Sequence, residues 1–110
     1  MAVQQWSDDI IVADLATEPA FSEDLAALAD ALENAPSHVV LNLDNVEYLN
    51  SSNIAQLLRL RKQLAESDLH LRLCSVPDSV WGVMLTTGLD SLFNVAQDMP
   101  TALTSLQLSE

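Results

Sequence analysis

Two adjacent serines, Ser51 and Ser52, stand where the chain passes from a loop into an expected helix, within the run YLNSSNI that starts at Tyr48. A serine at this point ordinarily accepts a hydrogen bond from the free amides of the first turn, so we expect at least one of the two to cap the helix. The same hydroxyls are also ready phosphate sites, because those amides and the positive end of the helix dipole stabilise added negative charge. Both interpretations stay open.

Residues for other kinds of chemistry lack the partners that they would need. Gly82 and Gly88 are the only glycines and neither lies between a strand and a helix start, so there is no glycine-rich phosphate loop. His38 and His70 have no cysteine or histidine at ligand spacing, and we expect them at the surface or at strand ends. Cys74, the only cysteine, is expected to be a small buried or half-buried side chain. The two serines lack the glycine-flanked turn of a serine hydrolase. We therefore expect no enzyme, no catalytic residue, no metal site and no cofactor.

The charge of the chain narrows the choice of partners. Sixteen acidic side chains oppose four basic ones, which gives a formal net charge of −12. A field of this sign repels nucleic acid and anionic lipid headgroups and speeds encounter with basic protein surfaces. Residues 1–58 contain no lysine or arginine, and the basic residues are Arg59, Arg61, Lys62 and Arg72. Most of the acidic side chains need no explanation beyond solubility.

The length of 110 residues predicts one domain spanning residues 1–110. With 49% apolar residues, the chain can build a core without disulfides or metals. The N-terminus does not read as a signal peptide, and no apolar stretch is long enough to cross a bilayer. We expect a cytoplasmic protein without membrane insertion, as a monomer or weak dimer.

Apolar alternation and helical periodicity predict five strands and four helices. The first helix is expected to start at Phe21 with Ser22 as its cap, and the third to start at Pro77 and end at a left-handed Gly88. The buried face of the third helix is assigned to Val80, Trp81, Met84 and Leu85. Strands are expected at about 2–6, 9–15, 38–43, 69–73 and 92–96, and helices at about 21–34, 52–66, 77–87 and 100–108.

This order of elements indicates an α/β fold, with a mostly parallel, four- to five-stranded open sheet and about four helices. In such sheets, ligands and partners usually meet the loops at the carboxyl ends of the strands. The loop of residues 44–52 is therefore expected at the functional edge.

Three blocks of the sequence carry a resemblance to a known family. They are VVLNLD at residues 39–44, VEYLNSSN at 46–53 together with LLRL at 57–60, and LTTGL at 85–89. In this order and spacing, the chain resembles the STAS family, the fold of sulfate-transporter tails and of anti-sigma factor antagonists, over nearly its whole length. The family usually has Asp-Ser-Ser-Gly or Asp-Ser-Thr-Gly in the second block.

The resemblance implies a regulatory switch. In antagonists of this family, an ATP-binding partner that is both serine kinase and anti-sigma factor phosphorylates the second hydroxyl residue, which corresponds to Ser52. The unmodified antagonist binds that partner and frees the sigma factor, and phosphorylation weakens the binding. Glu18 falls where many members have an acid after the second strand. Two positions depart from the pattern: Asn50 replaces the acid, and Asn53 replaces the glycine and adds bulk where a kinase backbone would approach. Phosphorylation of Ser52 is therefore left open.

The second helix has a candidate binding face. Ser52, Gln56, Arg59 and Gln63 point to one side, and Leu60 lies at the edge. An ordinary solvated face is an equally good interpretation. Ile54, Leu57, Leu58, Leu64 and Ala65 are expected to point toward the sheet, and Arg61 is expected to reach an acid. The residues assigned to partner binding are Glu18, Asn50, Ser51, Asn53, Gln56, Arg59 and Leu60.

Three functions follow as hypotheses. The leading one is a regulatory module that binds an anti-sigma factor with serine kinase activity and is switched off by phosphorylation at Ser52. The alternative is a constitutive STAS-like subunit or scaffold of a lipid-transport or stress-sensing complex, without phosphorylation. The third, an enzyme that binds a nucleotide or small molecule, predicts thermal stabilisation by its ligand.

Overall fold

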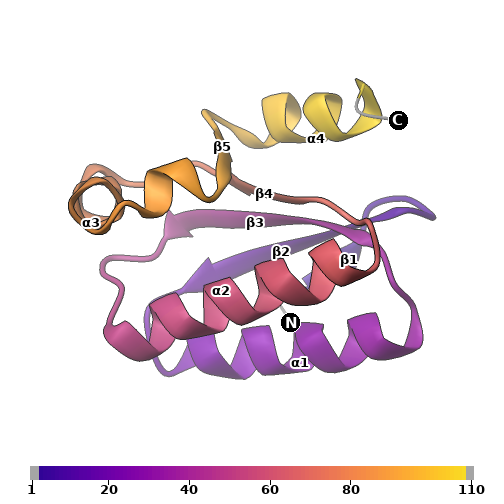
Figure 1. The fold of residues 1–110 in the computed structure, drawn as a ribbon, viewed down its shortest axis with the longest axis horizontal. Coiled ribbons are helices and arrows are strands. Elements are labelled where there is room, and N and C mark those ends of the chain that lie inside the picture. The colour runs from indigo at the N-terminus through magenta and orange to yellow at the C-terminus, as the bar shows by residue number, and fades with distance from the viewer. Residues whose placement is uncertain (1–2, 109–110) are drawn as a thin grey trace.

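The computed structural model describes residues 3–108. Five strands form one sheet in the order β1-β2-β3-β4-β5, in which β1 is antiparallel to β2 and every other pair is parallel (Figure 1). The expected mostly parallel sheet with four helices is thus confirmed, although Ala2 of the expected first strand lies outside the described residues. The elements are β1 (Val3–Gln5), β2 (Ile10–Ala16), α1 (Ala20–Asn34), β3 (His38–Asn45), α2 (Ser51–Glu66), β4 (Leu71–Cys74), α3 (Asp78–Thr87), a 3-10 turn (Leu89–Ser91), β5 (Asn94–Ala96) and α4 (Met99–Leu108).

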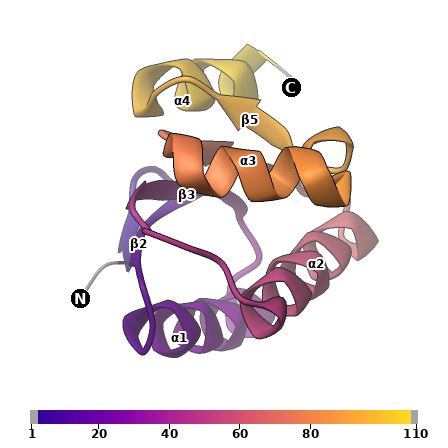
Figure 2. The ribbon, with the colours of Figure 1, turned by 90° about the vertical axis from the view of Figure 1, so that its left-hand side faces the viewer.

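The helices divide between the two faces of the sheet. Side chains from α1, α2 and α3 pack with one face into the main core, which includes Phe21, Leu28 and Leu57. Helix α4 covers the opposite face and makes a second, smaller core with Val12, Val40 and Cys74, as the separation of α4 from α1 and α2 in Figures 1 and 2 illustrates.

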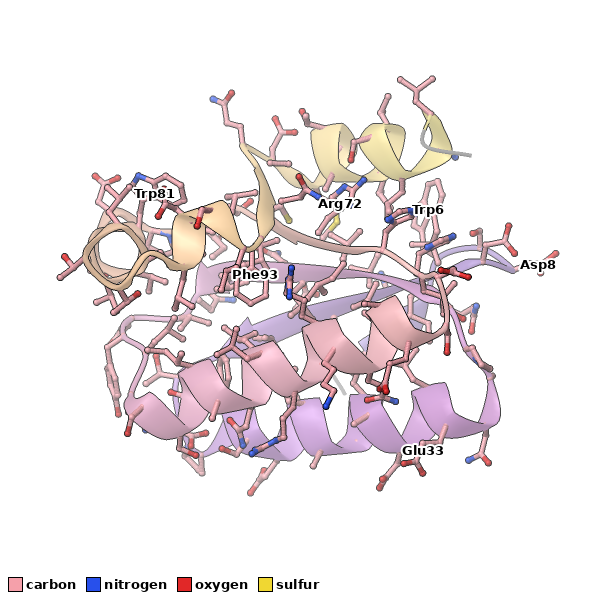
Figure 3. All side chains as sticks on the ribbon, viewed as in Figure 1. Trp6, Asp8, Glu33, Arg72, Trp81 and Phe93 are labelled. Carbon is pink, nitrogen blue, oxygen red and sulfur yellow. The ribbon has the colours of Figure 1, made fainter. Side chains whose placement is uncertain are left out.

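Arg72 holds α4 to the sheet. Its side chain lies between β4 and α4 (Figure 3) and is 9% exposed. Its Nε donates to Ser105 Oγ on α4 at 3.0 Å. Burial lowers the pKa of this guanidinium.

Several local expectations are wrong. Ser22 does not cap α1, because the helix already begins at Ala20 and Ser22 lies inside its first turn. The third helix begins at Asp78, with Pro77 as its N-cap residue. Leu85 is 52% exposed, because the inward face of α3 repeats every four residues from Val80 and Leu85 falls beside it. Strand β5 starts later than expected, because residues 89–91 first form the 3-10 turn.

Three assignments on α2 are also corrected. Ala65 is exposed rather than turned toward the sheet. Leu60 is buried rather than at the edge, because α1 packs beside it. Arg61 reaches no acid within residues 3–108: its Nε donates to the carbonyl oxygen of Leu92 at 2.8 Å.

The expectations for Gly88, Cys74 and the histidines are confirmed. Gly88 ends α3 with φ 78°, a left-handed conformation that favours glycine. Cys74 is buried. His38 is at the start of β3 and His70 just before β4, where their rings stack with centroids 5.3 Å apart.

Candidate functional site

The candidate site lies at the carboxyl edge of the parallel strands, in the loop of residues 46–50 and the first turn of α2. Hydrogen bonds from both sides fix this loop. The Glu47 amide donates to Thr17 Oγ1 at 2.8 Å, and the Ser79 hydroxyl of α3 donates to the Glu47 carbonyl oxygen at 3.0 Å. The start of α2 is therefore held between the end of β2 and the start of α3.

Asn50 and Asn53 cap α2 reciprocally. Asn50 is the N-cap residue, and its Oδ1 accepts the Asn53 amide at 2.8 Å. In return, Asn53 Oδ1 accepts the Asn50 amide at 3.1 Å, which completes a capping box. The expectation that one of the serines caps the helix is wrong, because an asparagine at the N-cap position already provides the acceptor.

The hydroxyls of Ser51 and Ser52 are therefore not needed to cap α2. They are the first two residues of α2, and both are exposed. Within residues 3–108, neither hydroxyl has a hydrogen-bond partner. The first amides of a helix also have no acceptor inside the helix, so they point toward any group added at this end. An exposed hydroxyl beside free amides at the positive end of a helix dipole is well suited to carry a phosphate.

Four polar side chains tie the start of α1 to the start of α2. Glu18 accepts the Ser22 amide at Oε1 (2.7 Å) and the Ser22 hydroxyl at Oε2 (2.6 Å). Gln56 Nε2 donates to Ser22 Oγ at 3.0 Å, and Asn53 Nδ2 donates to Gln56 Oε1 at 3.4 Å. We call Glu18, Ser22, Asn53 and Gln56 the Glu18 ring.

The ring stabilises the charged form of Glu18. The hydroxyl and amide of Ser22, with a smaller contribution from Asn53, lower the pKa of this carboxyl from its ordinary value of 4.5. Glu18 therefore carries a negative charge close to the first turns of α1 and α2, where the helix dipoles favour it.

A groove runs between α1 and α2, beginning at Gln56. Its volume is about 250 Å³, and Arg59 and Gln63 stand on its α2 side. Leu60 forms part of its floor although the side chain is buried. Gln63 Nε2 spans the two helices by donating to the Ala29 carbonyl oxygen at 3.3 Å.

The structure thus brings most of the expected binding residues to one region of the molecule, but two of them are buried there. Asn50, Ser51, Ser52 and Arg59 are exposed, and Glu18 and Gln56 are half-buried. Asn53 is 1% exposed, and Leu60 is buried as well. The bulk of Asn53 therefore points inward, away from the place where a kinase backbone was expected to approach. Partner contact by this set stays a prediction.

Sequence reasoning missed the part that Ser22 plays in the site. Ser22 and Gln56 are 34 positions apart, so no local spacing could place them in contact. The available signal was a polar side chain on each of two amphipathic helices near the carboxyl edge of the sheet.

Among residues 3–108, no group of three or more His, Cys, Asp or Glu side chains is arranged to hold a metal ion. No helix in the same range is long and apolar enough to span a membrane.

Comparison with known proteins identifies relatives of this fold. The model of the STAS domain family matches residues 13–102, which is most of the chain. No curated protein matches the sequence.

Three solved structures share the fold. A candidate anti-sigma factor antagonist from Thermotoga maritima superimposes with a TM-score of 0.83 at 16% identity, over 96% of this chain and 92% of that chain. A serine-to-glutamate variant of RsbS from Moorella thermoacetica gives 0.83 at 14% identity, over 97% and 94%. The phosphorylated form of SpoIIAA, a cell fate determinant from Bacillus, gives 0.67 at 16% identity, over 86% and 89%.

Proposed function

This chain belongs to the STAS domain family, and from that premise we propose that it is a regulatory protein-binding module of the anti-sigma factor antagonist type. Its partner is an anti-sigma factor that is also an ATP-binding serine kinase. The docking edge is the first turn of α2, and Ser52 is the residue that the kinase phosphorylates. The module itself performs no catalysis.

The observation that carries this proposal is the free hydroxyl of Ser52. Asn50 and Asn53 satisfy the capping requirement of α2, so modification of Ser52 removes no hydrogen bond from the fold. The two departures from the family pattern are compatible with this role. Asn50 supplies the capping oxygen that an aspartate at the same place would supply, and Asn53 turns its side chain into the Glu18 ring.

Charge explains how phosphorylation would switch the module. A phosphoserine carries a charge near −2 and must be desolvated when a partner docks over it. In a chain with a net charge of −12, the partner's complementary surface is basic, so the unmodified edge attracts it over a distance. The added phosphate pairs with the free amides of the helix start and occupies the surface that the partner needs.

Intact-mass measurement after incubation with the anti-sigma kinase and ATP tests the modification. We expect the wild type and the Ser51→Ala variant to gain one phosphoryl group and Ser52→Ala to gain none. Ser51→Ala is a matched control because Ser51 is also exposed and lies on the same helical turn. A wild type without mass gain, or a Ser52→Ala variant that still gains one, would contradict the assignment.

The loss of the family's acid at position 50 favours a second candidate function. In a constitutive subunit or scaffold of a lipid-transport or stress-sensing complex, the same edge would bind a partner without any phosphorylation cycle. An uncharged Asn50 keeps the helix cap and removes a carboxylate that could orient a kinase reaction, which suits a permanent contact.

A further inference from the structure

We infer that Glu18 is a positioning residue, which holds the first turn of α2 in its docking geometry through the Glu18 ring and does not itself contact the partner. The structural part of this inference stands on the ring alone. Its consequence for partner binding rests on the proposed function.

The hydrogen bonds of Glu18 are directed inward. One carboxylate oxygen accepts the Ser22 amide and the other accepts the Ser22 hydroxyl. These two bonds use about half of the acceptor sites of the carboxylate and hold it against the start of α1. The side chain is also only half-exposed.

The charge of Glu18 sets the direction of every later bond in the ring. Because the Ser22 hydroxyl donates to the carboxylate, its oxygen is left to accept, and it takes Gln56 Nε2. Gln56 Oε1 lies 3.4 Å from both Ser22 Oγ and Asn53 Nδ2. Because the Ser22 hydroxyl proton is committed to the shorter bond with Glu18, Asn53 Nδ2 is the donor to Oε1. Asn53 is then left with Oδ1 toward the Asn50 amide, the orientation that the capping box requires.

The ring accordingly connects a charge at the end of β2 with the cap of α2. Hydrogen bonds in such a chain polarise one another, so the first bond affects the last. The lowered pKa of Glu18 agrees with this direction of donation. None of the other ionisable side chains on the elements around it is a member of the ring. They are Asp14 on β2, His38 and Asp44 on β3, Glu47 in the loop before α2, Glu23, Asp24, Asp30 and Glu33 on α1, and Arg59, Arg61, Lys62 and Glu66 on α2.

Exchanging Glu18 for glutamine replaces one acceptor oxygen with a donor NH₂ group while keeping the size of the side chain. The new amide can accept only one of the two Ser22 donors, and its NH₂ group faces the other, so the Ser22 hydroxyl must turn. The Glu23→Gln variant is the matched control. Glu23 follows Ser22 in the first turn of α1 and is exposed, and its side chain has no hydrogen bond within residues 3–108.

An NMR pH titration of the free protein tests the structural part. In the wild type and in Glu23→Gln, we expect the side-chain amide signals of Asn53 and Gln56 to shift together, with a midpoint below pH 4.5. In Glu18→Gln, this shift should be absent and the Asn53 backbone amide should exchange about fivefold faster. As a second variant, Ser22→Ala should return the pKa of Glu18 toward 4.5 and uncouple the two amides. The inference is overturned if the side-chain amide signals of Asn53 and Gln56 do not shift as Glu18 titrates. It is also overturned if the Asn53 backbone amide of Glu18→Gln exchanges at the wild-type rate.

Binding measurements with the anti-sigma kinase test the consequence separately. We expect Glu18→Gln to bind more weakly than Glu23→Gln, although both remove one negative charge. Equal binding by these two variants would overturn the positioning role in docking. If the NMR result holds while no form of the protein binds the kinase, the proposed function fails and the structural role of Glu18 remains.

Discussion

Replacing Asn50 with alanine removes the acceptor that the first turn of α2 uses for the Asn53 amide, a bond of 2.8 Å. The reverse bond, from the Asn50 amide to Asn53 Oδ1, involves only the backbone of residue 50 and survives the change. One capping bond is therefore lost, for which we expect a decrease in the free energy of unfolding of about 1 kcal/mol. For a chain of this size, the melting temperature should fall by about 4 °C.

Urea denaturation followed by circular dichroism measures this loss. The m-value should stay unchanged, because the buried core is not altered. Ser51→Ala is the control: its hydroxyl has no partner within residues 3–108, so the free energy of unfolding should change by less than about 0.5 kcal/mol. If Ser51→Ala costs as much as Asn50→Ala, or Asn50→Ala costs nothing, the capping assignment is wrong and the serines are not free for modification.

Three further predictions concern other parts of the fold. Gly88→Ala should lower the free energy of unfolding by about 1 kcal/mol, because φ is 78° there. Gly82→Ala inside α3 should raise it slightly, because alanine is the better helix former, and at neither position does an added Cβ meet an atom within 4 Å. Equal effects of the two variants in urea denaturation would contradict this. Burial raises the pKa of the Cys74 thiol, so a thiol reagent should label it only in denaturant, and fast native labelling would contradict its position. Hydrogen bonds from Thr101 lower the pKa of Asp98 from 3.8, so its stabilising effect is full above that pH and is lost as the pH falls through the lowered pKa. Asp98→Asn should therefore flatten the acid limb of a plot of stability against pH, and an unchanged limb would argue against the bond.

Much of the fold could be predicted because local patterns and global packing agree in this sequence. The alternation around Val39, Leu41 and Leu43 predicts the central strand. The spacing of Phe21, Leu25 and Leu28 predicts the buried face of α1. Strand and helix alternation then left a parallel sheet as the natural arrangement. The errors fell at element ends, where one hydrogen bond decides which residue is the cap.

The sequence predicts that Ser52 lies at the start of a helix, but it does not predict which side chains contact one another around it. The position of Ser52 at the start of a helix follows from local sequence, and the structure has it there. The partners of Glu18, Ser22 and Gln56 could not be predicted, because they come from different elements and meet only after the sheet has formed. The burial of Leu60 has the same cause, since it depends on how closely α1 approaches α2.

The affinity of the anti-sigma kinase for the unmodified protein and for a Ser52→Glu variant tests the central claim most directly. A carboxylate at position 52 adds negative charge to the docking edge without altering the Asn50 cap, so we expect the dissociation constant to rise about tenfold or more, which corresponds to about 1.4 kcal/mol. Ser51→Glu serves as the control for a charge added to the same turn, and it should have a smaller effect. Equal affinity of the wild type and Ser52→Glu would contradict the switch and would favour a constitutive subunit instead.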